Sequence, residues 1–106
     1  MYNQITIIIT SINKLNRNIQ NLSSNSKKKN WSFILIGDKK SPKNFSLKYG
    51  KYYNIRDQKK TKINFAKICP LNNYARKNIG YLLAIKNKTE VIIETDDDNY
   101  PKKNFF

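Results

Sequence analysis

Three consecutive aspartates, Asp96, Asp97 and Asp98, close a stretch that begins with an apolar run at residues 91–93. A short apolar run between polar residues predicts a buried strand, with the acids at its carboxyl end. Like charges about 4 Å apart repel by roughly 1 kcal/mol in water and by several in a partly buried site. Carboxylates suit hard cations of the Mg²⁺ type, which join them to substrate phosphates. The stretch predicts a site for a divalent cation and a diphosphate; a solvated turn or a helix cap is the alternative.

A second chemical signal lies in the helix predicted at residues 74–86, directly before these acids. Arg76 and Lys77 fall in its first turn, where cations oppose the helix dipole. Their position becomes favourable if the helix N-terminus and Arg76 together receive an anionic group; the alternative is that both cations are solvated. Gly80 costs about 1 kcal/mol in a helix interior, which predicts close packing on a sheet. The expected apolar face of this helix comprises Ala75, Ile79, Leu82 and Leu83.

The elements that must position these groups predict an α/β domain. Residues 5–12 are mostly β-branched, and residues 31–36 form a second apolar run; both are typical of central parallel strands. A helix at residues 14–22 would connect them in a βαβ unit. We expect a polar, lysine-rich loop at residues 23–30. Residues 44–68 are the hardest part to interpret, with candidate short strands at 52–55 and 62–65.

The ends of the first two predicted strands carry polar side chains. Thr10 and Ser11 lie at the end of the first, and Asp38 follows the second in a turn. Parallel strands joined by a βαβ unit end at the same edge of a sheet, so these three residues should meet there.

Composition limits the chemistry available to the chain. It has no histidine and one cysteine, Cys69, which excludes His-based zinc sites, a Cys–His nucleophile pair and an internal disulfide. We expect Cys69 to be a buried apolar residue. No basic segment precedes the first apolar run, and that run is far too short to span a bilayer. We therefore expect no signal peptide, no membrane span and a cytoplasmic setting.

The basic balance of the chain motivates a different function. Its 106 residues include 21 Lys and Arg against 7 Asp and Glu, a net charge of +14, as in a nucleic-acid-binding module. The lysines are spread along the whole chain, however, and lysine, asparagine and isoleucine share A/T-rich codons. We expect attraction to anionic ligands such as nucleotides rather than to nucleic acid.

Two of these segments together resemble a known family. The run Ala-Arg-Lys-Asn-Ile-Gly at residues 75–80, followed by a strand ending in Asp-Asp-Asp-Asn at 96–99, resembles the nucleotide-sugar half of GT-A glycosyltransferases, and most closely the STELLO-like glycosyltransferases. Ile-Gly-Asp-Lys-Lys-Ser-Pro at 36–42 is similar to the same family's second-strand exit. The resemblance extends over residues 5–101, but only over the amino-terminal part of the family's catalytic domain.

The resemblance implies a donor site with defined residues. Asp96 and Asp98 match the family's Asp-x-Asp motif, which implies that Asp96 meets the ribose or sugar and that Asp98, with Asp96, holds Mn²⁺ or Mg²⁺. Arg76 matches a basic position that faces the nucleotide sugar. The matching ligand is a nucleotide-diphosphate sugar, a UDP-sugar before others, and the sequence does not indicate the acceptor.

The resemblance also implies an architecture. It implies a Rossmann-like, three-layer GT-A nucleotide-binding half with a mainly parallel, incomplete sheet, in which residues 1–106 form a single partial domain. Thr10, Ser11 and Asp38 match strand ends that hold the nucleoside. The family's strand order would place the aspartate strand beside the first strand, with a crevice at their carboxyl ends.

No catalytic residue is assigned, because the family's acceptor site and any catalytic base would lie in a carboxyl half that this sequence lacks. Hexosyl transfer would then need that half to be supplied. The alternatives are the nucleic-acid-binding module and a truncated remnant that folds without catalysing.

Overall fold

The computed structural model describes residues 4–11, 17–39, 41, 47, 49–61, 63–65, 69 and 74–96. It shows a four-stranded sheet in the order β3-β2-β1-β4, in which every neighbouring pair is parallel. The strands are β1 (Ile5–Thr10), β2 (Ser32–Ile36), β3 (Lys51–Tyr53) and β4 (Val91–Asp96). The predicted α/β class and parallel sheet are confirmed.

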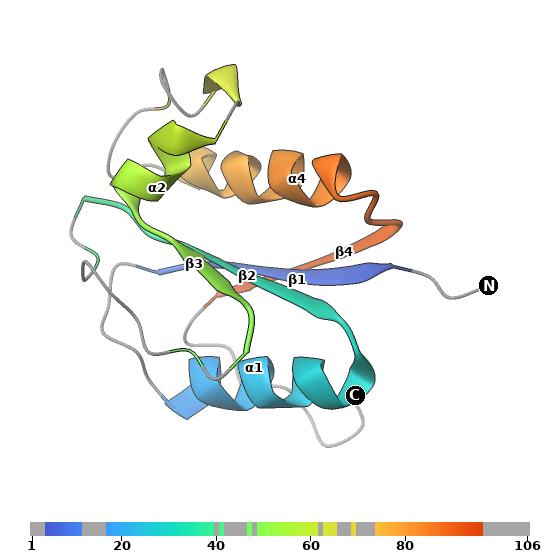
Figure 1. Cartoon of the computed structure of the whole chain (residues 1–106). Coiled ribbons are helices and arrows are strands. Elements are labelled where there is room, and N and C mark those ends of the chain that lie inside the picture. Colours follow the sequence, from blue (N-terminus) through green and yellow to red (C-terminus); the bar gives the residue numbers. More distant parts are fainter. Residues whose placement is uncertain are drawn as a thin grey trace.

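Helices cover both faces of this sheet, which makes three layers (Figure 1). One face packs against α1 (Arg17–Lys29); the other packs against α4 (Lys77–Lys86), with α2 (Ile55–Lys60) on the same side. A short 3₁₀ turn, η1 (Tyr74–Arg76), leads directly into α4. Because both faces are covered, the central strands are apolar on both sides, which explains their nearly continuous apolar runs.

Alternation along the strands divides the core into two clusters. Ile7 and Ile9 of β1 face α1, whereas Ile8 faces α4. The α4 cluster contains Ile8, Ile34, Ile36, Cys69, Ile79, Leu83 and Ala84. The α1 cluster contains Ile7, Ile9, Ile19, Leu22, Phe33 and Leu35. The predicted burial of Cys69 is confirmed.

The packing of α4 agrees with the prediction at Gly80 and departs from it at Leu82. A Cβ atom built on Gly80 would lie 2.6 Å from Ile8 Cγ2, so the expected close contact with the sheet is confirmed. Leu82, predicted on the apolar face, is 38% exposed. The buried stripe runs through Ile79, Gly80 and Leu83 instead, and Leu82 lies beside it on the helix surface.

The predicted loop at residues 23–30 is wrong, because α1 continues to Lys29. The second half of the helix is polar but is not wholly exposed: Ser23 and Ser26 are buried, and Ser26 Oγ donates to the Leu22 carbonyl at 2.7 Å. The lysines in the last turn stabilise the helix, because their positive charges interact favourably with the negative end of the helix dipole. Asn30, at φ 60°, ends the helix in the left-handed conformation that asparagine tolerates.

The predicted short strands fare differently. Within residues 52–55 the strand is confirmed for Tyr52 and Tyr53, but Ile55 begins α2. Within residues 62–65 the prediction is wrong, since Asn64 and Phe65 are helical. A capping box at Asn54 explains the switch into α2: its side chain accepts from the Asp57 N–H at 2.7 Å, and Asp57 accepts from the Asn54 N–H.

Candidate functional site

The strand order reverses at β1, because β2 and β3 lie on one side of it and β4 lies on the other. Open α/β sheets bind ligands in the crevice outside the carboxyl ends of their strands at such a switch point. Thr10, the last residue of β1, is in register with Asp96, the last residue of β4. The predicted adjacency of the first strand and the aspartate strand is therefore confirmed.

The ends of β1 and β2 are joined by hydrogen bonds through a serine that we did not predict. Ser41 Oγ accepts from the Asp38 N–H at 2.7 Å and donates to the Ser11 carbonyl at 2.6 Å. The Ser41 N–H bonds the Asp38 carbonyl at 2.9 Å, and the Ser11 N–H bonds the Ile36 carbonyl at 3.1 Å. Two of the residues predicted to hold a nucleoside, Ser11 and Asp38, therefore belong with Ser41 to one hydrogen-bonded group, which we call the strand-end cluster.

Tyr52 closes this cluster on the side of β3. A Cβ atom at Gly37 would lie 2.5 Å from the Tyr52 hydroxyl and 3.1 Å from Ser41 Cβ. Burial raises the pKa of Tyr52, the hydrogen bond with Ser41 lowers it, and the Asp57 charge raises it; the net pKa lies above the ordinary value of 10.0. The phenol is therefore neutral at physiological pH and can act as a hydrogen-bond donor.

Arg76 lies inside the protein, where it is 2% exposed. Its Nε and Nη2 donate to Gln58 Oε1 at 3.1 and 2.6 Å, and its Nη1 donates to the Cys69 carbonyl at 3.0 Å. The alternative that Arg76 and Lys77 are solvated is wrong, since Lys77 is only 8% exposed. Whether Arg76 faces a nucleotide sugar stays a prediction.

The charges of Asp38 and Arg76 act on the same small region of the protein. Burial raises the pKa of the Cys69 thiol, the Arg76 charge lowers it, and the Asp38 charge raises it. Two of the predicted site residues therefore influence one buried group, Cys69, which belongs to the α4 cluster.

Lys77 and Tyr81 of α4 both meet Glu94 of β4. Lys77 Nζ lies 2.8 Å from Glu94 Oε1, and the Tyr81 hydroxyl bonds Glu94 Oε2. These contacts tie α4 to β4 two residues before Asp96. They fix the backbone from which the aspartate stretch departs.

The predicted metal ligands are only partly within the described residues. The structure gives the backbone position of Asp96 at the end of β4, and Asp98 lies outside the described part. Within that part, no three His, Cys, Asp or Glu side chains gather in a way that could hold a metal ion. The metal site stays a prediction.

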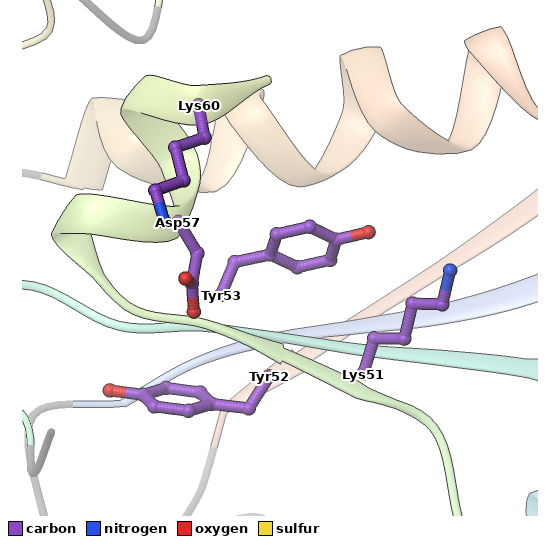
Figure 2. A pocket seen from close by; sticks show the side chains of 5 residues that line it. All are labelled: Lys51, Tyr52, Tyr53, Asp57 and Lys60. Carbon is purple, nitrogen blue, oxygen red and sulfur yellow. The ribbon is translucent and has the colours of Figure 1, made fainter. Parts of the chain in front are cut away.

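An open pocket of about 400 Å³ lies elsewhere, along the edge strand β3. Figure 2 shows Tyr52 and Tyr53 on opposite faces of β3, with Asp57 and Lys60 of α2 above the strand. The pocket shares Tyr52 with the strand-end cluster, but two strands, β2 and β1, separate β3 from β4. The pocket therefore lies away from the carboxyl ends of β1 and β4.

Comparison with known proteins gives a distant similarity to glycosyltransferases. Over 69 residues, 65% of this chain, it is 29% identical to an Arabidopsis thaliana protein described as probable glycosyltransferase STELLO2. Over 78 residues, 74% of this chain, it is 30% identical to probable glycosyltransferase STELLO1 of the same plant. The matched regions are 9% and 10% of those proteins, so the chain spans about a tenth of their length.

No protein-family model matches the chain, and no solved structure matches it. The fold is a parallel α/β sheet with a switch point at β1, and the similarity, partial and distant, is to glycosyltransferases. Among the described helices, none is long and apolar enough to cross a bilayer.

Proposed function

We propose that this chain is the nucleotide-diphosphate-sugar-binding part of a metal-dependent glycosyltransferase. The observation that carries the proposal is the register between Thr10 and Asp96 at the switch point, in a chain that resembles glycosyltransferases over most of its length. This register supports the proposal, because open α/β sheets bind ligands outside the carboxyl ends of their strands at a switch point.

In this proposal, Asp96 and Asp98 hold Mn²⁺ or Mg²⁺. Carboxylates are suitable ligands for either ion, which when bound would neutralise charge on the donor diphosphate. The protein's own excess of positive charge, +14, favours the approach of such an anionic ligand. A UDP-sugar is the donor that we propose, in a cytoplasmic protein.

The nucleoside would lie over the strand-end cluster. Thr10, Ser11 and Asp38 supply polar groups at the ends of β1 and β2, and Ser41 fixes the spacing between the last two through bonds of 2.6 and 2.7 Å. Arg76 contributes a buried positive charge that, like the charge of Asp38, acts on Cys69. No residue of this chain is assigned to bond cleavage or to acceptor binding.

Two charge-matched variants test the metal site. Calorimetric titration with UDP in the presence of Mn²⁺ should give measurable binding to the unsubstituted chain and to Glu90→Gln, because Glu90 is exposed before the start of β4. Asp98→Asn removes a ligand at almost constant shape. We expect UDP affinity to fall by at least about tenfold, since even the outer partners of metal ligands are worth 10–100-fold.

The same titration distinguishes the alternative functions. Salt-sensitive binding to any nucleic acid, unaffected by Asp98→Asn, would instead support the basic nucleic-acid-binding module. If the folded chain binds neither UDP nor nucleic acid, it is a remnant without a donor site.

A further inference from the structure

Gln58 is a fully buried amide, 0% exposed, in the middle of a polar network. Its Nε2 donates to the Gly37 carbonyl at 2.8 Å and to the Tyr53 carbonyl at 2.9 Å. Its Oε1 accepts two bonds from Arg76, at 3.1 and 2.6 Å. One side chain of α2 therefore connects the end of β2, the end of β3 and Arg76, the residue directly before α4.

Each of these bonds restrains a part of the proposed site. Gly37 is the residue before Asp38. Its carbonyl accepts from Gln58 and its N–H donates to the Tyr53 carbonyl at 2.9 Å, so the peptide groups on both sides of Gly37 are restrained. The two bonds to Arg76 orient its guanidinium in one plane, because a guanidinium donates in a rigid fork. The third described bond of Arg76, to the Cys69 carbonyl at 3.0 Å, continues the network.

Glutamine has the hydrogen-bonding pattern that this position needs. Two carbonyls require donors, and one cation requires an acceptor; a neutral amide supplies both from a single planar group. A glutamate would still accept from Arg76, but its oxygens would then oppose the carbonyls of Gly37 and Tyr53. A methionine would fill the space and satisfy neither side, and buried polar groups without partners are costly.

We infer that Gln58 is a positioning residue of the nucleotide site: it presents Asp38 through Gly37 and orients Arg76. This inference rests on the proposed function and adds to it a residue outside the crevice that sets nucleoside affinity. Gln58 acts on the nucleoside side of the site, formed by β1 and β2. The metal side, at the end of β4, is separated from β2 by β1.

The test separates the two sides of the site in the full chain. UDP affinity in Mn²⁺, Mn²⁺ affinity without nucleotide, and the unfolding midpoint should be measured for Gln58→Glu, Gln58→Met and a control, Gln4→Glu. Gln4 is exposed, and only its backbone carbonyl is described as accepting, from the N–H groups of Glu90 and Val91. The control therefore makes the same chemical change next to the amino-terminal end of β1, at the opposite end of the strand from the proposed site. We expect both Gln58 variants to lose about tenfold in UDP affinity, the equivalent of one hydrogen bond of ~1.4 kcal/mol. Mn²⁺ affinity should be unchanged.

A double-mutant cycle protects the test against general loss of stability. Arg76→Lys keeps the positive charge but loses the rigid fork. If Gln58 acts through Arg76, the losses in UDP affinity of Gln58→Met and Arg76→Lys should not add in the double variant.

Three results would overturn the inference: unchanged UDP affinity in folded Gln58 variants, equal losses of Mn²⁺ and UDP affinity, or additive losses in the cycle. If the unsubstituted chain binds no UDP, the proposed function fails and this inference fails with it. If the unsubstituted chain binds UDP and the Gln58 variants bind it equally well, only the role of Gln58 is overturned.

Discussion

Gly80 lets α4 pack closely against the sheet, since a Cβ atom built on it would lie 2.6 Å from Ile8 Cγ2. Gly80→Ala should destabilise the protein by about 1–3 kcal/mol through overpacking, reduced by up to about 1 kcal/mol of gained helix propensity. Urea unfolding measures the difference. The matched control is Asn78→Ala, at an exposed position of the same helix, which should change stability little. Equal stability of Gly80→Ala and the unsubstituted chain would contradict the close contact.

Tyr52 makes the stability of the protein depend on pH in the alkaline range. Its folded-state pKa is raised, mainly by burial, above the ordinary value of 10.0, so the unfolded chain loses this proton first as pH rises. The stability from the neutral phenol is therefore complete below about pH 10 and is lost as pH rises through the folded-state pKa. Tyr52→Phe should make the alkaline decline shallower, as measured by urea unfolding at several pH values. An unchanged slope would show that Tyr52 is not buried as described.

At the residue scale, sequence reasoning found groups with distinctive chemistry and missed groups defined by their surroundings. Arg76 stood out because a cation in the first turn of a helix opposes the dipole. Gln58 and Ser41 carry no such signal, since an ordinary amide and an ordinary hydroxyl gain their importance here from the carbonyls of Gly37 and Ser11, 21 and 30 residues away in the sequence. No pattern within a single segment could have revealed these partners.

Among the elements, α2 depends most visibly on its cap. The Asn54 side chain accepts from the Asp57 N–H at 2.7 Å, and the helix is only 6 residues long. Asn54→Ala should cost about 1 kcal/mol of stability, in the usual range of 0.5–2 for such caps, whereas Asn54→Asp should preserve most of it. Thermal unfolding of both variants provides the comparison. A loss as large for Asp as for Ala would contradict a capping role.

Apolar patterning predicted the elements that build the core and failed where burial is polar. Apolar runs revealed β1, β2 and β4, because the side chains of these strands contribute to the core on the two faces of the sheet. An apolar stripe revealed α4, because that helix packs on one of these faces. The second half of α1 was missed because its inward residues include Ser23 and Ser26, which predict a loop as readily as a helix. The Asn-x-x-Asp pattern at Asn54 was a usable signal for α2.

The net charge of +14 acts on the molecule as a whole. At about 0.01 M salt the screening length is roughly 30 Å, larger than the radius of gyration of 13.1 Å, so basic groups repel one another across the entire protein. Raising the salt to about 0.15 M shortens this length to roughly 8 Å. The thermal midpoint should therefore rise with NaCl. A midpoint that falls with added salt would mean that attractive ion pairs outweigh the repulsion.

The site could be predicted from the sequence in its general position but not in its details. The parallel order β2-β1-β4 follows from three apolar runs and a family resemblance, and it brings Thr10 into register with Asp96. The link from Ser11 through Ser41 to Asp38 depends on turn geometry that local patterning does not encode.

The central claim is that the crevice beside β4 binds a nucleoside diphosphate through a divalent cation. Its most direct test is calorimetric titration of the unsubstituted chain with UDP, once in excess Mn²⁺ and once in EDTA. We predict that UDP binds at least about tenfold more tightly in Mn²⁺, a gain of ~1.4 kcal/mol or more. Equal affinity under the two conditions, or no binding under either, would contradict the claim.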